Sequence, residues 1–213
     1  MHRLADPAYT VPSPGPAGPP GTIAWLRATV SRFAAGETHA RRRALVEARL
    51  RELDPAALRA EAHEAARRGD QPPAYLPVAV LAAATGVAAR DVAAAVAAVR
   101  VVAAAYHPGT RANGADEALG RLIDLLPPGE PEAVAQHVAL LVQACEATAA
   151  LVRGGLERPL DEVLPVPATR RLDPTGNLVA IPLDGRPFGA GPRTCPGREH
   201  ALALAAGVVE GVR

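Results

Sequence analysis

The chain has 213 residues, 49% of them hydrophobic but only 3% aromatic, and a formal net charge of +1. This length supports one or two compact domains, and an apolar content made mostly of small side chains favours helices packed on helices. All the basic residues are arginines that nearly balance the acids, which argues against a nucleic-acid-binding surface.

The two cysteines, Cys145 and Cys195, are too few for a disulfide framework and form no CxxC pair, so we expect a reducing, cytoplasmic location. Residues 1–21 are rich in proline and lack the apolar segment of a secretory signal, which predicts an extended arm. The most apolar window, residues 133–152, contains polar and charged side chains, so we expect a buried helix and no membrane span.

Residues 22–213 are predicted to form a single, mainly α-helical domain. Helical spacing of apolar residues predicts two helices over 22–53, with a break at Gly36 and a cap at Thr38. Residues 159–197 are rich in proline and glycine, which predicts a loop with one small strand or hairpin. Further helices are predicted over 54–68, 76–105 with a division at Gly86, 113–126, 132–153 and 198–212.

The segment PFGAGPRTCPG, residues 187–197, presents one cysteine on a glycine-rich loop directly before a helix. Glycines 189, 191 and 197 let the backbone turn tightly and approach a flat partner closely. Backbone N–H groups and the helix N-terminus are expected to stabilise a thiolate at Cys195, which makes it a preformed metal ligand. Arg193 supplies a cation for a carboxylate on the same partner.

This loop resembles the haem-binding loop of the cytochrome P450 family, FGxGxRxCxG, at every fixed position. The resemblance implies that Cys195 is the axial thiolate ligand of haem b iron, with Gly189 and Gly197 in the cofactor loop. It also implies that Phe188 packs near the sulfur and that Arg193 contacts a haem propionate. The alternative is a structural loop with a buried thiol.

The segment ETHARRR, in the second predicted helix, resembles the HxxxR pair of the family's C-helix. His39 and Arg43 lie four residues apart, on one face of a helix, and the resemblance implies that both contact a propionate. An exposed arginine-rich helix face is the alternative.

The segment HVALLVQACEATAALV resembles the family's I-helix, which crosses the haem. In this register Ala144 takes the place of the family's glycine and Glu146 that of the acid, while Ala147 and Thr148 take the places of the two threonines. The resemblance implies proton delivery by Glu146 and Thr148, and the missing alcohol at Ala147 departs from it. The alternative is a core helix whose Glu146 pairs with an arginine.

The segment LDEVLPVPATRRLDPTGN resembles the end of the family's K-helix and its following strand, in which an arginine reaches the haem. Arg171 is the preferred equivalent and Arg170 the second choice. The family's ExxR pair would begin at Glu162, but Pro165 stands where its arginine belongs.

These segments together imply a shortened P450-like helical fold with a reduced β region before the cysteine loop and an open pocket. The resemblance implies monooxygenation of a small organic molecule, or a peroxide-driven relative of it, with electrons from a separate ferredoxin- or reductase-type protein. The alternatives are a haem-free homologue that assists another enzyme and a haem protein that senses or transports. Apolar surface left by the missing sheet also suggests dimerisation.

Overall fold

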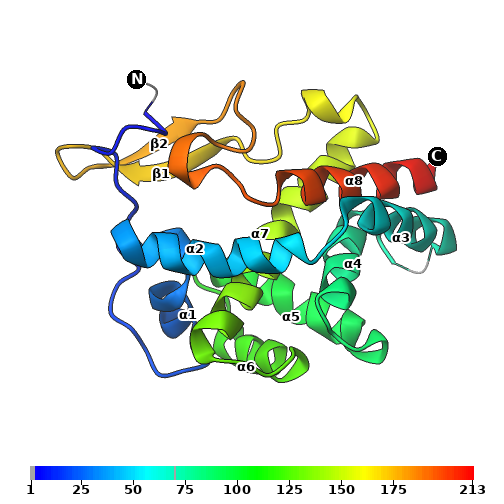
Figure 1. Cartoon of the computed structure of the whole chain (residues 1–213), viewed down its shortest axis with the longest axis horizontal. Helices are drawn as coiled ribbons and strands as arrows, with labels where there is room; N and C mark the ends of the chain where they lie inside the picture. The colour runs from blue at the N-terminus through cyan, green and yellow to red at the C-terminus, as the bar shows by residue number, and fades with distance from the viewer. Residues whose placement is uncertain (1–2, 70) are drawn as a thin grey trace.

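The computed structural model describes residues 3–69 and 71–213, so residues 1 and 2 of the predicted arm lie outside the described residues. The described part is mainly α-helical with one two-stranded sheet, which confirms the predicted fold class (Figure 1). Its α-helices are α1 (Ile23–Thr29), α2 (Gly36–Arg51), α3 (Pro55–Arg68), α4 (Leu76–Ala84), α5 (Val92–Ala105), α6 (Ala115–Leu125), α7 (Pro131–Gly155) and α8 (Arg198–Val212). The 3-10 turns are η1 (Ser31–Phe33), η2 (Pro73–Tyr75), η3 (Ala89–Asp91), η4 (Leu160–Glu162) and η5 (Gly191–Arg193).

Helix α7 is the centre of the fold and packs against α1, α2, α4, α5, α6 and α8. Many of its apolar side chains, Val138, Ala139 and Leu141 among them, are fully buried. Among the described helices, α7 alone has the length and composition to cross a membrane, but 61% of its most apolar window is buried inside the protein. The prediction of a buried helix is confirmed.

Helices α3 and α8 run side by side and approach each other closely (Figure 1). A Cβ atom at Gly207 of α8 would lie 2.2 Å from the carbonyl oxygen of Arg59, and one at Gly211 would lie 2.4 Å from that of His63. Since such contacts are far inside van der Waals distance, only glycine permits this packing.

Strands β1 (Ala168–Leu172) and β2 (Leu178–Pro182) form the antiparallel hairpin, in the register Ala168↔Pro182 to Leu172↔Leu178. Thr10 of the N-terminal arm forms a β-bridge with Leu172, so the arm adds to the free edge of β1. A small second core of Leu4, Ile181 and Leu183 lies beneath the hairpin.

One local prediction is wrong. Helix α2 begins at Gly36, which takes a φ of +55°, and its cap is Ala35, so Thr38 lies inside the first turn. Residues 160–162, compared above with the end of a K-helix, form only a 3-10 turn, which agrees with the loop predicted over 159–197, and Pro165 follows shortly after it.

Candidate functional site

The cysteine loop, residues 187–197, closes one side of a cavity of ≈ 490 Å³ whose opposite side is α7. This volume is in the range of small-molecule and cofactor sites. Helix α2, the turn η1, strand β1 and the start of α8 complete its walls. Every site residue expected from the sequence lines this one cavity: His39, Arg43, Ala144, Glu146, Thr148, Arg171, Phe188, Gly189, Arg193, Cys195 and Gly197.

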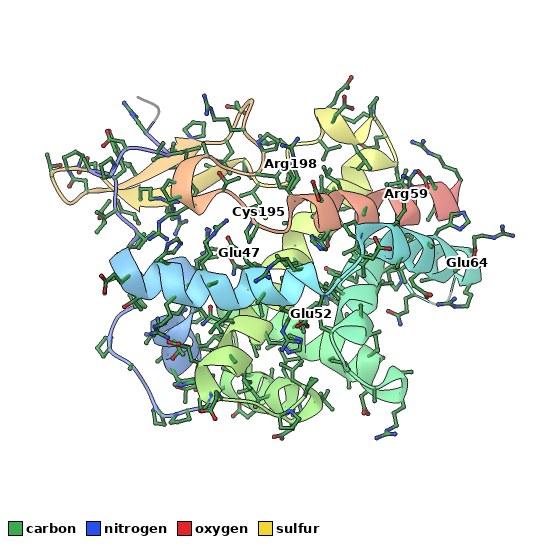
Figure 2. All side chains as sticks on the ribbon, viewed as in Figure 1. Glu47, Glu52, Arg59, Glu64, Cys195 and Arg198 are labelled. Atoms are coloured by element: carbon green, nitrogen blue, oxygen red, sulfur yellow. The ribbon has the colours of Figure 1, made fainter. Side chains whose placement is uncertain are left out.

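The cysteine loop holds the Cys195 side chain at the cavity, between the start of α8 and α2 (Figure 2). The Cys195 amide donates to the carbonyl oxygen of Phe188 at 2.8 Å, which closes the loop on itself. Gly189 and Gly191 take φ values of +79° and +67°, so these turns need glycine as expected. Gly197 has a φ of −96°, and the backbone conformation does not require a glycine there.

The Cys195 thiol is open to solvent through the cavity, while protein surrounds the sulfur on its other sides. Burial raises the pKa of this thiol, although a hydrogen bond from the Gly197 amide and the charges of Arg43 and Arg32 act in the opposite direction. This balance does not favour a thiolate before a metal binds, because loss of hydration opposes the hydrogen bond and the two positive charges. A metal that binds Cys195 must displace its proton.

Three side chains tie the cysteine loop and the start of α8 to neighbouring elements. Arg193 donates to the carbonyl oxygens of Arg32 and Ala34, and Arg43 of α2 donates to that of Thr194 at 2.7 Å. His200 Nε2 contacts the carbonyl oxygens of Leu50 and Leu53 at 3.0 and 3.2 Å, so this nitrogen carries a proton. These contacts with η1 and α2 support the loop, whereas Glu162, where an ExxR pair would begin, is exposed.

Strand β1 places its two arginines on opposite faces, because side chains alternate along a strand. Arg171 is buried and lines the cavity, whereas Arg170 is exposed. Arg171 donates to the Thr169 hydroxyl at 2.9 Å and to the Arg170 carbonyl oxygen at 2.8 Å. The first choice from the sequence is thus the cavity residue.

The cavity wall carries more positive charge than its carboxylates neutralise. Among residues 3–69 and 71–213, no carboxylate forms an ion pair with Arg32, Arg171 or Arg193, while Arg43 pairs with Glu47. Burial, together with the charges of Arg32 and Arg193, lowers the pKa of Arg171 to about 10. Burial also lowers the pKa of His39, with Arg193 and Arg43 adding to the effect. Such a wall suits an anionic ligand.

Helix α7 contributes a different surface. Ala144, Glu146 and Thr148 all line the cavity, but the Glu146 carboxylate is largely exposed and pairs loosely with Arg153 at 3.9 Å. The ion pair named in the alternative interpretation is therefore present. Thr148 is buried, and its hydroxyl lies 3.5 Å from the Cys145 carbonyl oxygen. Cys145 is itself a buried thiol.

Sequence reasoning missed Arg32, Tyr106 and His107 as residues of the cavity wall. None belongs to a motif with fixed spacing. Their positions in the sequence could have drawn attention to them. Arg32 precedes the core residue Phe33, and Tyr106 and His107 directly follow the apolar helix α5.

The donor set of the cavity fits haem better than a bare metal ion. In the described part of the chain, no group of three or more His, Cys, Asp or Glu side chains could hold a metal ion. A porphyrin supplies four nitrogen ligands itself, so its iron needs one protein ligand, and its propionates need cations. Cys195 and the unneutralised arginines match both requirements.

Comparisons with known proteins point to the same fold. No protein-family model and no curated protein matches the sequence. A solved structure of P450BioI, in complex with an acyl carrier protein ligated to hexadec-9Z-enoic acid, matches with a TM-score of 0.74 and 15% sequence identity. The match covers 98% of this chain and 80% of that chain. The chain therefore has the fold of a cytochrome P450.

Proposed function

We propose that this chain is a haem-thiolate oxidoreductase that acts on a small organic molecule. One observation carries the proposal: residues from α2, α7, β1 and the cysteine loop, chosen from sequence motifs alone, line a single cavity. Chance placement does not gather separate segments around one thiol.

In this proposal haem b lies between the cysteine loop and α7. Cys195 would ligate the iron, and Arg193, Arg171, Arg43 and His39 would hold the propionates. Phe188, Gly189, Gly197 and Ala144 contact the ring. When bound, thiolate-ligated iron supplies the electron density that favours O–O bond cleavage.

Glu146 is the residue we propose to move protons. Its carboxylate reaches both the cavity and solvent, so it can accept a proton from water and release it inside. Ala147 offers no hydroxyl, and the Thr148 hydroxyl faces the backbone, so Glu146 has no alcohol partner on the open side of α7. We expect slow, poorly coupled oxygen chemistry and better activity with peroxide.

The electrons of a monooxygenase reaction would come from another protein. A groove of ≈ 940 Å³ open to solvent lies between α3, α8 and the cysteine loop, and it shares Pro187 and Phe188 with the cavity. Both signs of charge line this groove: Arg59 and Arg198, which Figure 2 labels, and Glu64, Asp161 and Glu210. We propose it as the docking surface for a separate ferredoxin- or reductase-type protein, in the cytoplasm, where both free thiols stay reduced.

The test is the absorption spectrum of protein expressed with ample haem, then reduced and exposed to carbon monoxide. We expect the red-shifted Soret band of thiolate-ligated haem in the wild type and in the matched control Cys145→Ala, and its loss in Cys195→Ala. An unshifted band in the wild type would contradict thiolate ligation and favour sensing or transport. Absence of haem would contradict the proposal and favour the haem-free auxiliary protein.

A further inference from the structure

Three polar residues of the cavity wall have no role in the function proposed above. Arg32 of η1 lines the cavity together with Tyr106 and His107, which directly follow α5, and its charge acts on both of these groups. The rings of Tyr106 and Phe33 lie 5.4 Å apart, and those of Tyr106 and His107 lie 5.7 Å apart. Segments far apart in the sequence thus share one packed corner.

The Tyr106 hydroxyl is buried without a hydrogen-bond partner. The residue is 2% exposed, and no described group lies within hydrogen-bond distance of its oxygen. Burial raises the pKa of this hydroxyl, so it carries its proton and acts as a donor. A buried donor without an acceptor costs roughly 1–3 kcal/mol, so an acceptor supplied by a ligand would be favourable.

Arg32 provides the positive charge of this corner. In the described part of the chain no carboxylate pairs with it, and its charge lowers the pKa of His107, Arg171 and Arg193. Burial and this charge lower the pKa of His107 to about 4, so its imidazole is neutral and retains one N–H donor. An unpaired arginine beside neutral donors suits an anion.

The side chains of Arg27 and Gln136 hold the backbone of this corner in place before any ligand binds. The Arg27 guanidinium donates to carbonyl oxygens at the end of α5 and beyond, including those of Tyr106 at 3.1 Å and His107 at 2.7 Å. On the other side, Gln136 Oε1 accepts from the Ser31 amide at 2.9 Å, directly before Arg32. Fixed donors lose little entropy on binding.

We propose that Arg32, Tyr106 and His107 form a carboxylate-binding subsite in which the guanidinium pairs with a carboxylate that also accepts from the Tyr106 hydroxyl. The carboxylate has two possible sources, a haem propionate or the acid group of an organic substrate. The inference rests on the proposed function only for the first source, since a free carboxylate could bind without haem.

The experiment uses Tyr106→Phe and Arg32→Gln in the full chain, with Tyr75→Phe and Arg100→Gln as matched controls. Tyr75 and Arg100 stack with the ring centroid 4.2 Å from the guanidinium, away from this cavity. The probes are haem, haem dimethyl ester, octanoate and 1-octanol, titrated by absorption or calorimetry.

If the source is a propionate, both variants should bind haem about tenfold more weakly and the dimethyl ester unchanged. If the source is a substrate, they should bind octanoate about tenfold more weakly, with 1-octanol and haem unchanged. Equal affinity of wild type and variants for both acids would overturn the proposal. A wild type that binds no haem would contradict the proposed function. The octanoate titrations of wild type and variants would then be the test of the subsite.

A readout without ligand separates this role from a structural one. Because the hydroxyl has no partner, Tyr106→Phe should unfold at the same temperature as the wild type or higher. A lower unfolding temperature would show a partner within the protein and would overturn the proposal.

Discussion

The cysteine loop and the α3–α8 interface are held by different forces. The loop depends on hydrogen bonds from Arg43 and Arg193 to backbone carbonyls, at the wall of a solvent-open cavity. The interface depends on backbones in contact, with Gly207 against the Arg59 carbonyl. We infer that the interface determines stability, whereas the loop determines what the cavity binds.

The largest effect should come from adding bulk at the interface. Gly207→Val forces side-chain atoms into the Arg59 carbonyl, so the free energy of unfolding should fall by about 3 kcal/mol or more in urea denaturation. Gly120→Ala is the control, because a Cβ there meets nothing within 4 Å, and it should stabilise α6 slightly. Equal stability of Gly207→Val and wild type would mean that α3 and α8 pack less closely.

A buried histidine should make the scaffold sensitive to acid. His137 of α7 is 2% exposed, and burial together with the charge of Arg49 lowers its pKa from 6.5 to about 4. Between these pH values the unfolded chain binds a proton that the folded chain does not, so stability falls as pH falls, by about 3 kcal/mol at most.

His137→Gln should remove that part of the pH dependence in urea titrations between pH 7 and 4. His39→Gln, at the more open cavity wall, should change the slope far less. Parallel pH profiles for wild type and His137→Gln would count against a neutral buried His137.

The loop contacts should affect binding more than folding. Arg43→Leu removes the donor to the Thr194 carbonyl and one cation of the cavity, so haem affinity should fall about tenfold while stability changes by less than about 1 kcal/mol. The control Arg59→Leu breaks an exposed ion pair with Glu210 and should change neither. If Arg43→Leu failed to fold, the loop contact would be required for stability, which would contradict this prediction.

The smallest structural effect should come from the exposed acid of α7. Glu146→Gln should leave stability and haem content unchanged within about 0.5 kcal/mol, because its ion pair with Arg153 is exposed and long. Turnover with peroxide should slow, since the amide cannot accept a proton. Arg153→Gln is the control for loss of the ion pair, and equal turnover in all three proteins would exclude Glu146 from proton transfer.

Residues in recognisable sequence patterns could be predicted, whereas residues placed only by the packing of helices could not. Helix α7 follows from a long apolar pattern, and Cys195 and Arg193 follow from a loop whose glycines leave a recognisable spacing. Arg171 was chosen from the resemblance, and the alternation of side chains along β1 buries it while Arg170 is exposed. Arg32 and Tyr106 could not be found this way, because their place in the cavity depends on how η1 and α5 pack against α7.

The thiol's electrostatics could not be read from the sequence either. The motif shows that Cys195 has cationic neighbours, but the balance between their charges and lost hydration depends on three-dimensional burial.

The most direct measurement is iron-edge X-ray absorption of the haem-loaded protein, compared with Cys195→Ala. We expect one sulfur ligand at the iron of the wild type and none in Cys195→Ala. An iron coordinated only by nitrogen and oxygen in the wild type would contradict a cavity built around the Cys195 thiolate.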